Sequence, residues 1–328
     1  RVMTDNAVLA RMLSDADPAP TPRDAAPDAR ALATRDRILR TSTAPRRRRR
    51  RALGWASGLT AVAASTALAF AVLSPQGAAV AGMPSPLEFD GSVTVAQVVD
   101  GAEASLAESP GPGEPVRSVR TASWGFNVEV DSKTTTVVPQ LSTLTWEPDG
   151  SGRATTIDGV PYDPSDAAAS NAAEVTSSGR VVNDLVMAPG DFTTPWTAVP
   201  GETHDDMVAM LRAFGMPDDP TAFDVETAFT SVLGQWTLTN AQHRELLLLL
   251  EEAGGGQALG TTTDRLGRPV DGIRVQSPDG AVSDVVLVSR DTGRIVGVER
   301  TVLIADELFA AGSIISYQMW DVEEDVFR

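Results

Sequence analysis

The chain contains no cysteine among its 328 residues, and it has only two histidines and one lysine. The absence of cysteine excludes disulfides, thiolate metal sites, a cysteine nucleophile and a lipidated N-terminal cysteine. Lys133 is the single lysine against 26 arginines, which indicates the codon bias of a high-GC genome and no particular function. A domain without disulfides must be held together by its own apolar core, and this chain is long enough to form one.

The motifs of common catalytic classes are also absent. There is no HExxH zinc motif and no GxSxG nucleophile turn. Asp291-Thr292-Gly293 matches the active triplet of aspartic proteases, but those enzymes use two such carboxylates and no second triplet exists here. A turn with Gly293 at positive φ explains the triplet better. We therefore predict no catalytic residue and no cofactor.

The two histidines leave one metal-site alternative. His204, with Asp205 and Asp206, would join His243 in a site if their two helices packed side by side. Zinc usually needs three or four ligands at defined spacing, and that spacing is missing. Two capped helix starts explain the same residues, so we predict no metal.

Charge divides the chain sharply. Residues 1–51 carry 13 Arg and 6 Asp, a net of +7, whereas residues 74–328 carry a net of −24. A part this acidic is repelled by phosphate backbones, so nucleic acid is not an expected partner.

Residues 52–73 predict a membrane-spanning helix, because they contain neither charge nor proline. At about 1.5 Å per residue they reach about 33 Å, enough to cross a hydrocarbon layer of about 30 Å. A run of arginines directly precedes them and is expected to stay on the cytoplasmic side, against the lipid bilayer. The run consists of Arg46, Arg47, Arg48, Arg49, Arg50 and Arg51.

Two other interpretations of this segment stay open. Cleavage after Ala81 would make it a signal peptide, although its length and the preceding residues favour an uncleaved anchor. Its alanine content would also suit a helix in a soluble core. Gly54 and Gly58 form a GxxxG spacing that would allow a weak dimer of spans, but chance explains that spacing better in so alanine-rich a segment.

The flanking regions predict a tail and a spacer. Residues 1–45 are too polar to bury a core, so they are either disordered or fold onto a cytoplasmic regulatory protein through residues 9–13. Residues 74–91 carry Pro75, Pro84 and Pro86 and are typical of a linker.

Residues 92–328 are expected to form one extracytoplasmic α+β domain. Thr94 and Gln97 have capping-box spacing, as do Thr239 and Gln242, and Thr203 and Thr221 precede two further helical patterns. Short runs rich in β-branched residues, separated by turns, predict antiparallel strands between and after the helices. We expect a curved antiparallel sheet with helices against one face.

Large aromatic side chains are spread over the predicted strands and helices. They would line an apolar groove between sheet and helices, or they are simply the core. The groove candidates are Trp124, Phe126, Trp146, Phe214, Phe229 and Trp236.

The order of elements and three short stretches resemble an actinobacterial family of single-pass membrane proteins often encoded beside extracytoplasmic-function sigma factors. The stretches are Asp264-Arg265-Leu266-Gly267-Arg268-Pro269, Asp291-Thr292-Gly293-Arg294 and residues 313–317. The outer domain is also similar in fold order to the half-barrels of lipoprotein carriers and of envelope-stress sensors. The resemblance implies a topology and a regulatory context, and no reaction.

The expected function is therefore that of a non-enzymatic, membrane-anchored extracytoplasmic sensor or binding protein, linked to sigma-factor signalling through the inner tail. The alternative is a carrier or binder of an apolar ligand such as a lipid at the cell envelope.

Overall fold

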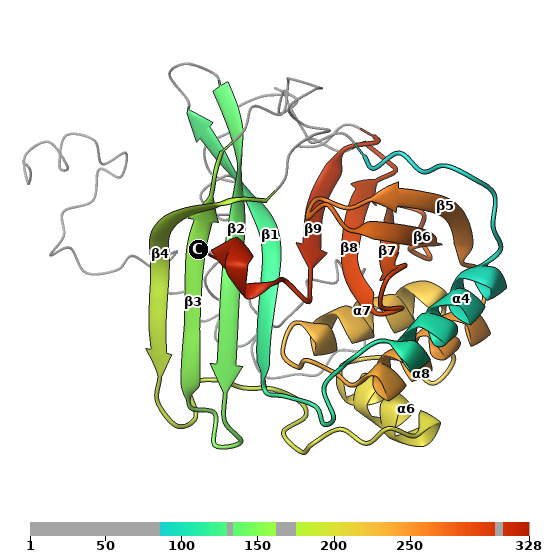
Figure 1. Ribbon diagram of the computed structural model, residues 1–328, viewed down its shortest axis with the longest axis horizontal. Coiled ribbons are helices and arrows are strands. Elements are labelled where there is room, and N and C mark those ends of the chain that lie inside the picture. Colours follow the sequence, from blue (N-terminus) through green and yellow to red (C-terminus); the bar gives the residue numbers. More distant parts are fainter. Residues whose placement is uncertain (1–85, 130–133, 162–174, 306–310, 328) are drawn as a thin grey trace, which may run out of the picture. The chain divides into compact units, whose positions relative to one another are not determined.

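The computed structural model describes residues 86–129, 134–161, 175–305 and 311–327. They form a nine-stranded, open antiparallel sheet together with four α-helices, which is an α+β fold (Figure 1). The strand order is β4-β3-β2-β1-β9-β8-β7-β6-β5. The predicted fold class is confirmed at this level.

The element bounds follow the predicted order. The strands are β1 Ser118–Glu129, β2 Thr134–Trp146, β3 Gly152–Gly159, β4 Ser177–Met187, β5 Gln257–Thr263, β6 Pro269–Gln276, β7 Val282–Ser289, β8 Ile295–Val302 and β9 Ile314–Met319. The helices are α4 Val95–Glu108, α6 His204–Ala213, α7 Ala222–Leu233, α8 Asn240–Glu252 and the short 3-10 helix η1 Glu324–Phe327.

The sheet consists of two meanders that meet in the middle. Strands β1 to β4 form one and β5 to β9 the other, and short connections make neighbouring strands antiparallel within each. The meanders join where β1 pairs with β9, over only two residue pairs, Ala122 with Met319 and Ser123 with Gln318. The helical insert α6–α8 connects β4 to β5 along the chain.

Each α-helix begins at a threonine cap, as predicted. In every case the hydroxyl accepts from the backbone N–H three residues on, and the side chain of that third residue returns a bond to the cap. These capping boxes satisfy N–H groups that the first helical turn leaves unpaired. The caps are Thr94, Thr203, Thr221 and Thr239.

Apolar side chains fill both faces of the sheet. On β7, Val286 and Val288 belong to the main core, which also contains the buried faces of all four helices. Val285 and Leu287 alternate with them and belong to a separate cluster. This alternation follows from the period of two in a strand.

The predicted linker ends earlier than residue 91. Phe89 packs in the cluster of Val285 and Leu287, and it lies so close to Gly272 of β6 that a side chain at that position would overlap its ring. Asp90 forms a backbone bridge with Thr261 at the edge strand β5. Apolar burial holds residues 86–90 on the sheet, so this part of the expected spacer belongs to the domain.

The arginine run and the predicted span at residues 52–73, with Gly54 and Gly58, lie outside the described residues. Ala81 lies outside them as well. Within the described ranges, no helix is long and apolar enough to cross a membrane.

A buried cluster of charged side chains joins helix α7 to the sheet. Arg300 donates to both carboxylate oxygens of Asp284, at 2.8 and 2.6 Å. Glu226 on α7 is fully buried and accepts from the Thr230 hydroxyl at 2.7 Å. Burial, reinforced by the Asp284 carboxylate, raises the pKa of Glu226 well above its ordinary value.

This raised pKa predicts a stability that falls with increasing pH. The folded state keeps the Glu226 proton, whereas the unfolded chain loses it above the ordinary value of 4.5. The stabilisation that protonated Glu226 gives the folded state is therefore complete below pH 4.5, and it declines as the pH rises toward the pKa of Glu226 in the folded state. Glu226→Gln should flatten this slope and should have the higher free energy of unfolding of the two proteins at about pH 8.

Urea unfolding of the full chain in detergent, followed at several pH values, measures this difference. Glu252→Gln, at the exposed end of α8, is the matched control and should keep the wild-type slope. Parallel slopes for wild type and Glu226→Gln would contradict the prediction.

Candidate functional site

The candidate site forms where the start of β8, the end of β9 and the first turn of α8 come together. The Asp291–Gly293 turn leads directly into it. Gly293 has a φ of 73° and lies against α4, where a side chain would overlap the carbonyl of Ala102. The predicted turn is thus confirmed, and only glycine fits it.

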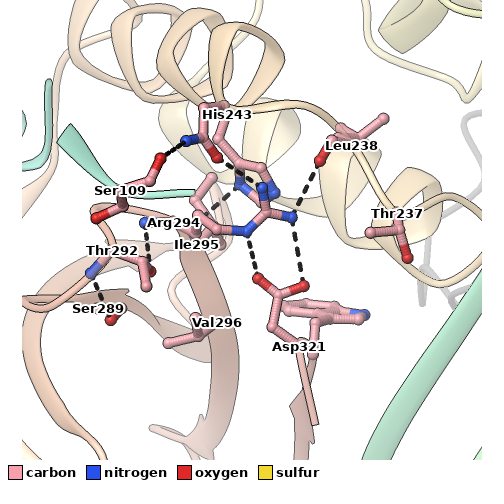
Figure 2. A network of polar contacts seen from close by, with 12 residues as sticks. Ser109, Thr237, Leu238, His243, Ser289, Thr292, Arg294, Ile295, Val296 and Asp321 are labelled. Carbon is pink, nitrogen blue, oxygen red and sulfur yellow. Dashed lines mark hydrogen bonds and ion pairs between the residues drawn. The ribbon is translucent and has the colours of Figure 1, made fainter. Parts of the chain in front are cut away.

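Arg294 follows this turn and is the centre of the site (Figure 2). Its side chain is only 6% exposed and forms an ion pair with Asp321 through Nε and a second nitrogen. It also donates to the Leu238 carbonyl at 3.0 Å and to Asn240 Oδ1 at 2.9 Å. One guanidinium therefore holds the chain after β9 against the start of α8.

Asn240 extends the network to α4. Its amide nitrogen donates to the carbonyls of Leu106 and Ser109, at 2.9 and 3.0 Å, at the end of that helix. The Ser109 hydroxyl in turn donates to the Asp291 carbonyl at 3.0 Å. The two bonds from Asn240 thus pair carbonyl groups that the end of α4 leaves without a partner inside the helix.

Asp321 is held in an uncommon backbone conformation. Its φ is 53°, and it is the only non-glycine residue with positive φ in the described ranges. Aspartate tolerates this region better than most residues. Burial alone would raise the pKa of Asp321, but Arg294 outweighs it by charge and hydrogen bonding, so the pKa is lowered and the carboxylate stays ionised.

His243 lies beside Arg294 and is almost completely buried. Its Nδ1 accepts from the backbone N–H of Ile295 at 3.2 Å. Burial, assisted by the nearby Arg294 charge, lowers its pKa to about 3. At neutral pH the ring is therefore uncharged, and its single proton is on Nε2 because Nδ1 is an acceptor.

These residues line a cavity of about 180 Å³, which we call the Arg294 cavity. Its polar wall contains Arg120, Thr237, His243, Arg294, Asp321 and Glu323. Its largely apolar wall contains Val119, Leu233, Trp236, Leu238, Trp320 and Val322. The cavity thus combines a charged, hydrogen-bonding side with a hydrophobic one.

Three buried N–H groups of the lining residues have no hydrogen-bond partner among the described residues. They are His243 Nε2, Trp236 Nε1 and Trp320 Nε1. A buried donor without an acceptor costs about 1–3 kcal/mol. Three such donors, all on residues that line one cavity, leave this part of the domain short of hydrogen-bond acceptors.

The predicted groove residues do not line this cavity as a group. Trp146 and Trp236 meet edge to face, with centroids 5.0 Å apart, and belong with Phe229 to the main core. Phe214 packs against that core. Trp124 belongs to a different cluster, beside Tyr317 at 5.8 Å, and the side chain of Phe126 lies outside the described residues. Of the six candidates, only Trp236 lines the Arg294 cavity.

The two histidines have separate environments. His204 is 44% exposed and lies 3.6 Å from Glu245. His243 makes its contacts with Ile295 and the Arg294 network. In the part of the chain that the structure describes, no three histidine or carboxylate side chains are grouped so as to hold a metal.

Sequence reasoning missed the roles of Asp321 and Trp320 entirely. It selected Arg294 only as part of a turn motif and His243 only as a metal candidate. The available signal was an arginine directly after a turn that requires glycine, but its partner Asp321 is 27 residues away and no local pattern connects the two.

No protein-family model matches the sequence. A search of curated proteins likewise gives no match.

The lowered pKa of His243 predicts a loss of stability in acid. The unfolded chain protonates this histidine below its ordinary value of 6.5, whereas the folded state resists protonation down to about 3. The contribution of uncharged His243 to the free energy of unfolding is complete above pH 6.5, and it declines as the pH falls from 6.5 toward about 3. His243→Gln should remove roughly 2–3 kcal/mol of the decline between about pH 6.5 and pH 4.5.

Urea unfolding of the full chain across this interval measures the effect. His204→Gln replaces the only other histidine, which is half exposed, and should leave the acid slope unchanged. Equal slopes for His243→Gln and the wild type would show that His243 is not the responsible group.

Proposed function

We propose that this protein is a membrane-anchored extracytoplasmic binding protein whose folded domain holds a small ligand in the Arg294 cavity. The observation that carries the proposal is the coincidence of a partly open cavity of about 180 Å³ with three buried N–H groups that have no acceptor among the described residues. Ligand sites typically combine an apolar lining with a few fixed polar groups, and this cavity has both.

Binding is favoured over catalysis by the state of the ionisable groups. Asp321 accepts two bonds from Arg294 and is kept ionised, so it is a poor proton donor. His243 has its basic nitrogen occupied by the Ile295 amide and a pKa of about 3, so it is a weak base at neutral pH. Both groups are suited to holding a ligand in place.

A lipid carrier is less well supported by this site. About 180 Å³ corresponds to roughly six water molecules in the liquid, whereas pockets for larger ligands are about 300–1,000 Å³. The charged network on one wall also disfavours a purely apolar occupant. The ligand we propose is small and partly polar.

The position of this domain and its regulatory role derive from the sequence. Residues 52–73 serve as the anchor, the arginine run keeps residues 1–45 inside the cell, and the inner tail transmits the ligand state to a cytoplasmic regulator. The resemblance to proteins encoded beside sigma factors supports this arrangement.

The binding proposal predicts that a fitting small molecule stabilises the full chain. A ligand at 100 times its Kd should add about 2.7 kcal/mol and raise Tm by roughly 5 °C or more. Thermal unfolding in detergent is measured with small acids, amides, alcohols and amines of up to about ten non-hydrogen atoms as probes.

A matched pair of variants locates the effect. Val322 is buried and lines the cavity, so Val322→Phe should abolish the shift in Tm. Val326→Phe makes the same substitution four residues later, at a half-buried position that does not line the cavity, and should preserve it. A shift that survives Val322→Phe would place binding elsewhere, and no shift with any probe would contradict the proposed function.

The anchor proposal predicts a C-terminus outside the cell. A tag after Arg328 should be accessible to a membrane-impermeant reagent on intact cells, whereas a tag before Arg1 should become accessible only after permeabilisation. The opposite accessibility, or extraction of the chain without detergent, would refute the proposed topology.

A further inference from the structure

The hydrogen-bonding atoms of the Arg294 cavity narrow the class of ligand. The unpartnered groups are all donors: two indole N–H groups and the Nε2–H of a neutral imidazole. An indole nitrogen can only donate, and His243 has already used its one acceptor. A ligand that pairs with these groups must therefore present acceptors.

The acceptors around Arg294 each already take part in a hydrogen bond. Both carboxylate oxygens of Asp321 accept from Arg294, as does the Leu238 carbonyl. The Thr237 carbonyl accepts from the Val116 N–H, and its hydroxyl donates to the Ser118 carbonyl. A ligand that presents only N–H groups would leave the three unpartnered donors of the lining residues unsatisfied.

The cavity lining offers a cation to an anionic ligand. The positive charge of Arg294 is matched by Asp321, whose pKa is lowered, so that pair stays ionised. Arg120 lines the same cavity, is 42% exposed, and lies 3.9 Å from Glu324, while the exposed Glu323 also belongs to the lining. A half-exposed guanidinium is a suitable partner for a negative head group.

The remaining wall indicates an apolar body behind that head group. Val119, Leu233, Leu238 and Val322 contribute aliphatic surface, and the two indoles contribute flat faces. About 180 Å³ suits a molecule of roughly six to ten non-hydrogen atoms.

We infer that the Arg294 cavity binds a small monocarboxylate with a short aliphatic or aromatic body. This inference depends on the proposed function and names the ligand class for the same cavity. The three nitrogens are out of contact with solvent in the structure, so the carboxylate reaches them after a small rotation of the rings. Binding should therefore change tryptophan fluorescence.

Matched acids and amides test the charge and acceptor requirement. Butyrate and butyramide, and benzoate and benzamide, have nearly the same shape, but each amide replaces an acceptor oxygen by a donor NH2. Each is titrated into the full chain in detergent by fluorescence and by calorimetry, with inorganic phosphate as a further arm. We expect at least one acid to bind at least tenfold more tightly than its amide, since a bond to a charged acceptor is worth about 1.5–3 kcal/mol.

Indole substitutions test which donors are used. Trp236→Phe and Trp320→Phe remove an N–H while keeping an aromatic ring, and each should weaken the acid at least tenfold with little effect on the amide. Trp124→Phe is the control, because Trp124 lies in a different cluster and does not line the cavity. Circular dichroism confirms that each variant is folded.

The outcomes separate this inference from the proposed function. Equal affinity for acid and amide, a preference for phosphate, or indifference to both indole substitutions would overturn the carboxylate assignment. If a probe binds in one of these ways and Val322→Phe still abolishes its binding, the cavity remains a binding site and only the ligand class is wrong. Absence of binding by every probe would end both proposals.

Discussion

Burial of the Arg294 charge is the constraint on which the described domain depends most. A guanidinium that is 6% exposed is stable only if its charge is balanced and its N–H groups are paired. Asp321, the Leu238 carbonyl and Asn240 meet this requirement; Asp321 follows β9, whereas Leu238 and Asn240 lie at the start of α8. Through them one side chain positions the chain after β9, the start of α8 and, by way of Asn240, the end of α4.

Several donors near Arg294 have no partner in the described part of the chain. The indoles of Trp236 and Trp320 and the Nε2–H of His243 make no hydrogen bond with the described residues. Other buried ion pairs show the difference. Arg265 pairs with Glu299 at 2.6 Å, and Arg300 with Asp284 at 2.6 Å, but none of these four residues lines the Arg294 cavity. What distinguishes the Arg294 pair is the cavity beside it and the unpartnered N–H groups among the residues that line this cavity.

Local signals predicted the elements of the fold, and long-range pairing determined the site. Each threonine cap, and likewise the turn at Gly293, depends on a few adjacent residues, so the sequence alone was sufficient to predict them. The face of a strand is different: Val119 and Ala122 on β1 belong to opposite clusters, and Trp124 follows Ala122 by the period of two. Nothing local says which of these faces meets the helices, so the aromatic groove drawn from the sequence mixed both. The pairing of Arg294 with Asp321 has no local signature at all.

The two meanders are joined by a short stretch of backbone pairing, and this junction lies at the Arg294 cavity. With only two residue pairs, β1 and β9 resist sliding far less than β1 and β2, which pair along their whole length. The Arg294 cavity spans this junction, because Val119 and Arg120 come from β1 whereas Trp320 and Asp321 follow β9. A molecule held there would contact both meanders at once, so its binding free energy would strengthen a junction at which backbone pairing is short.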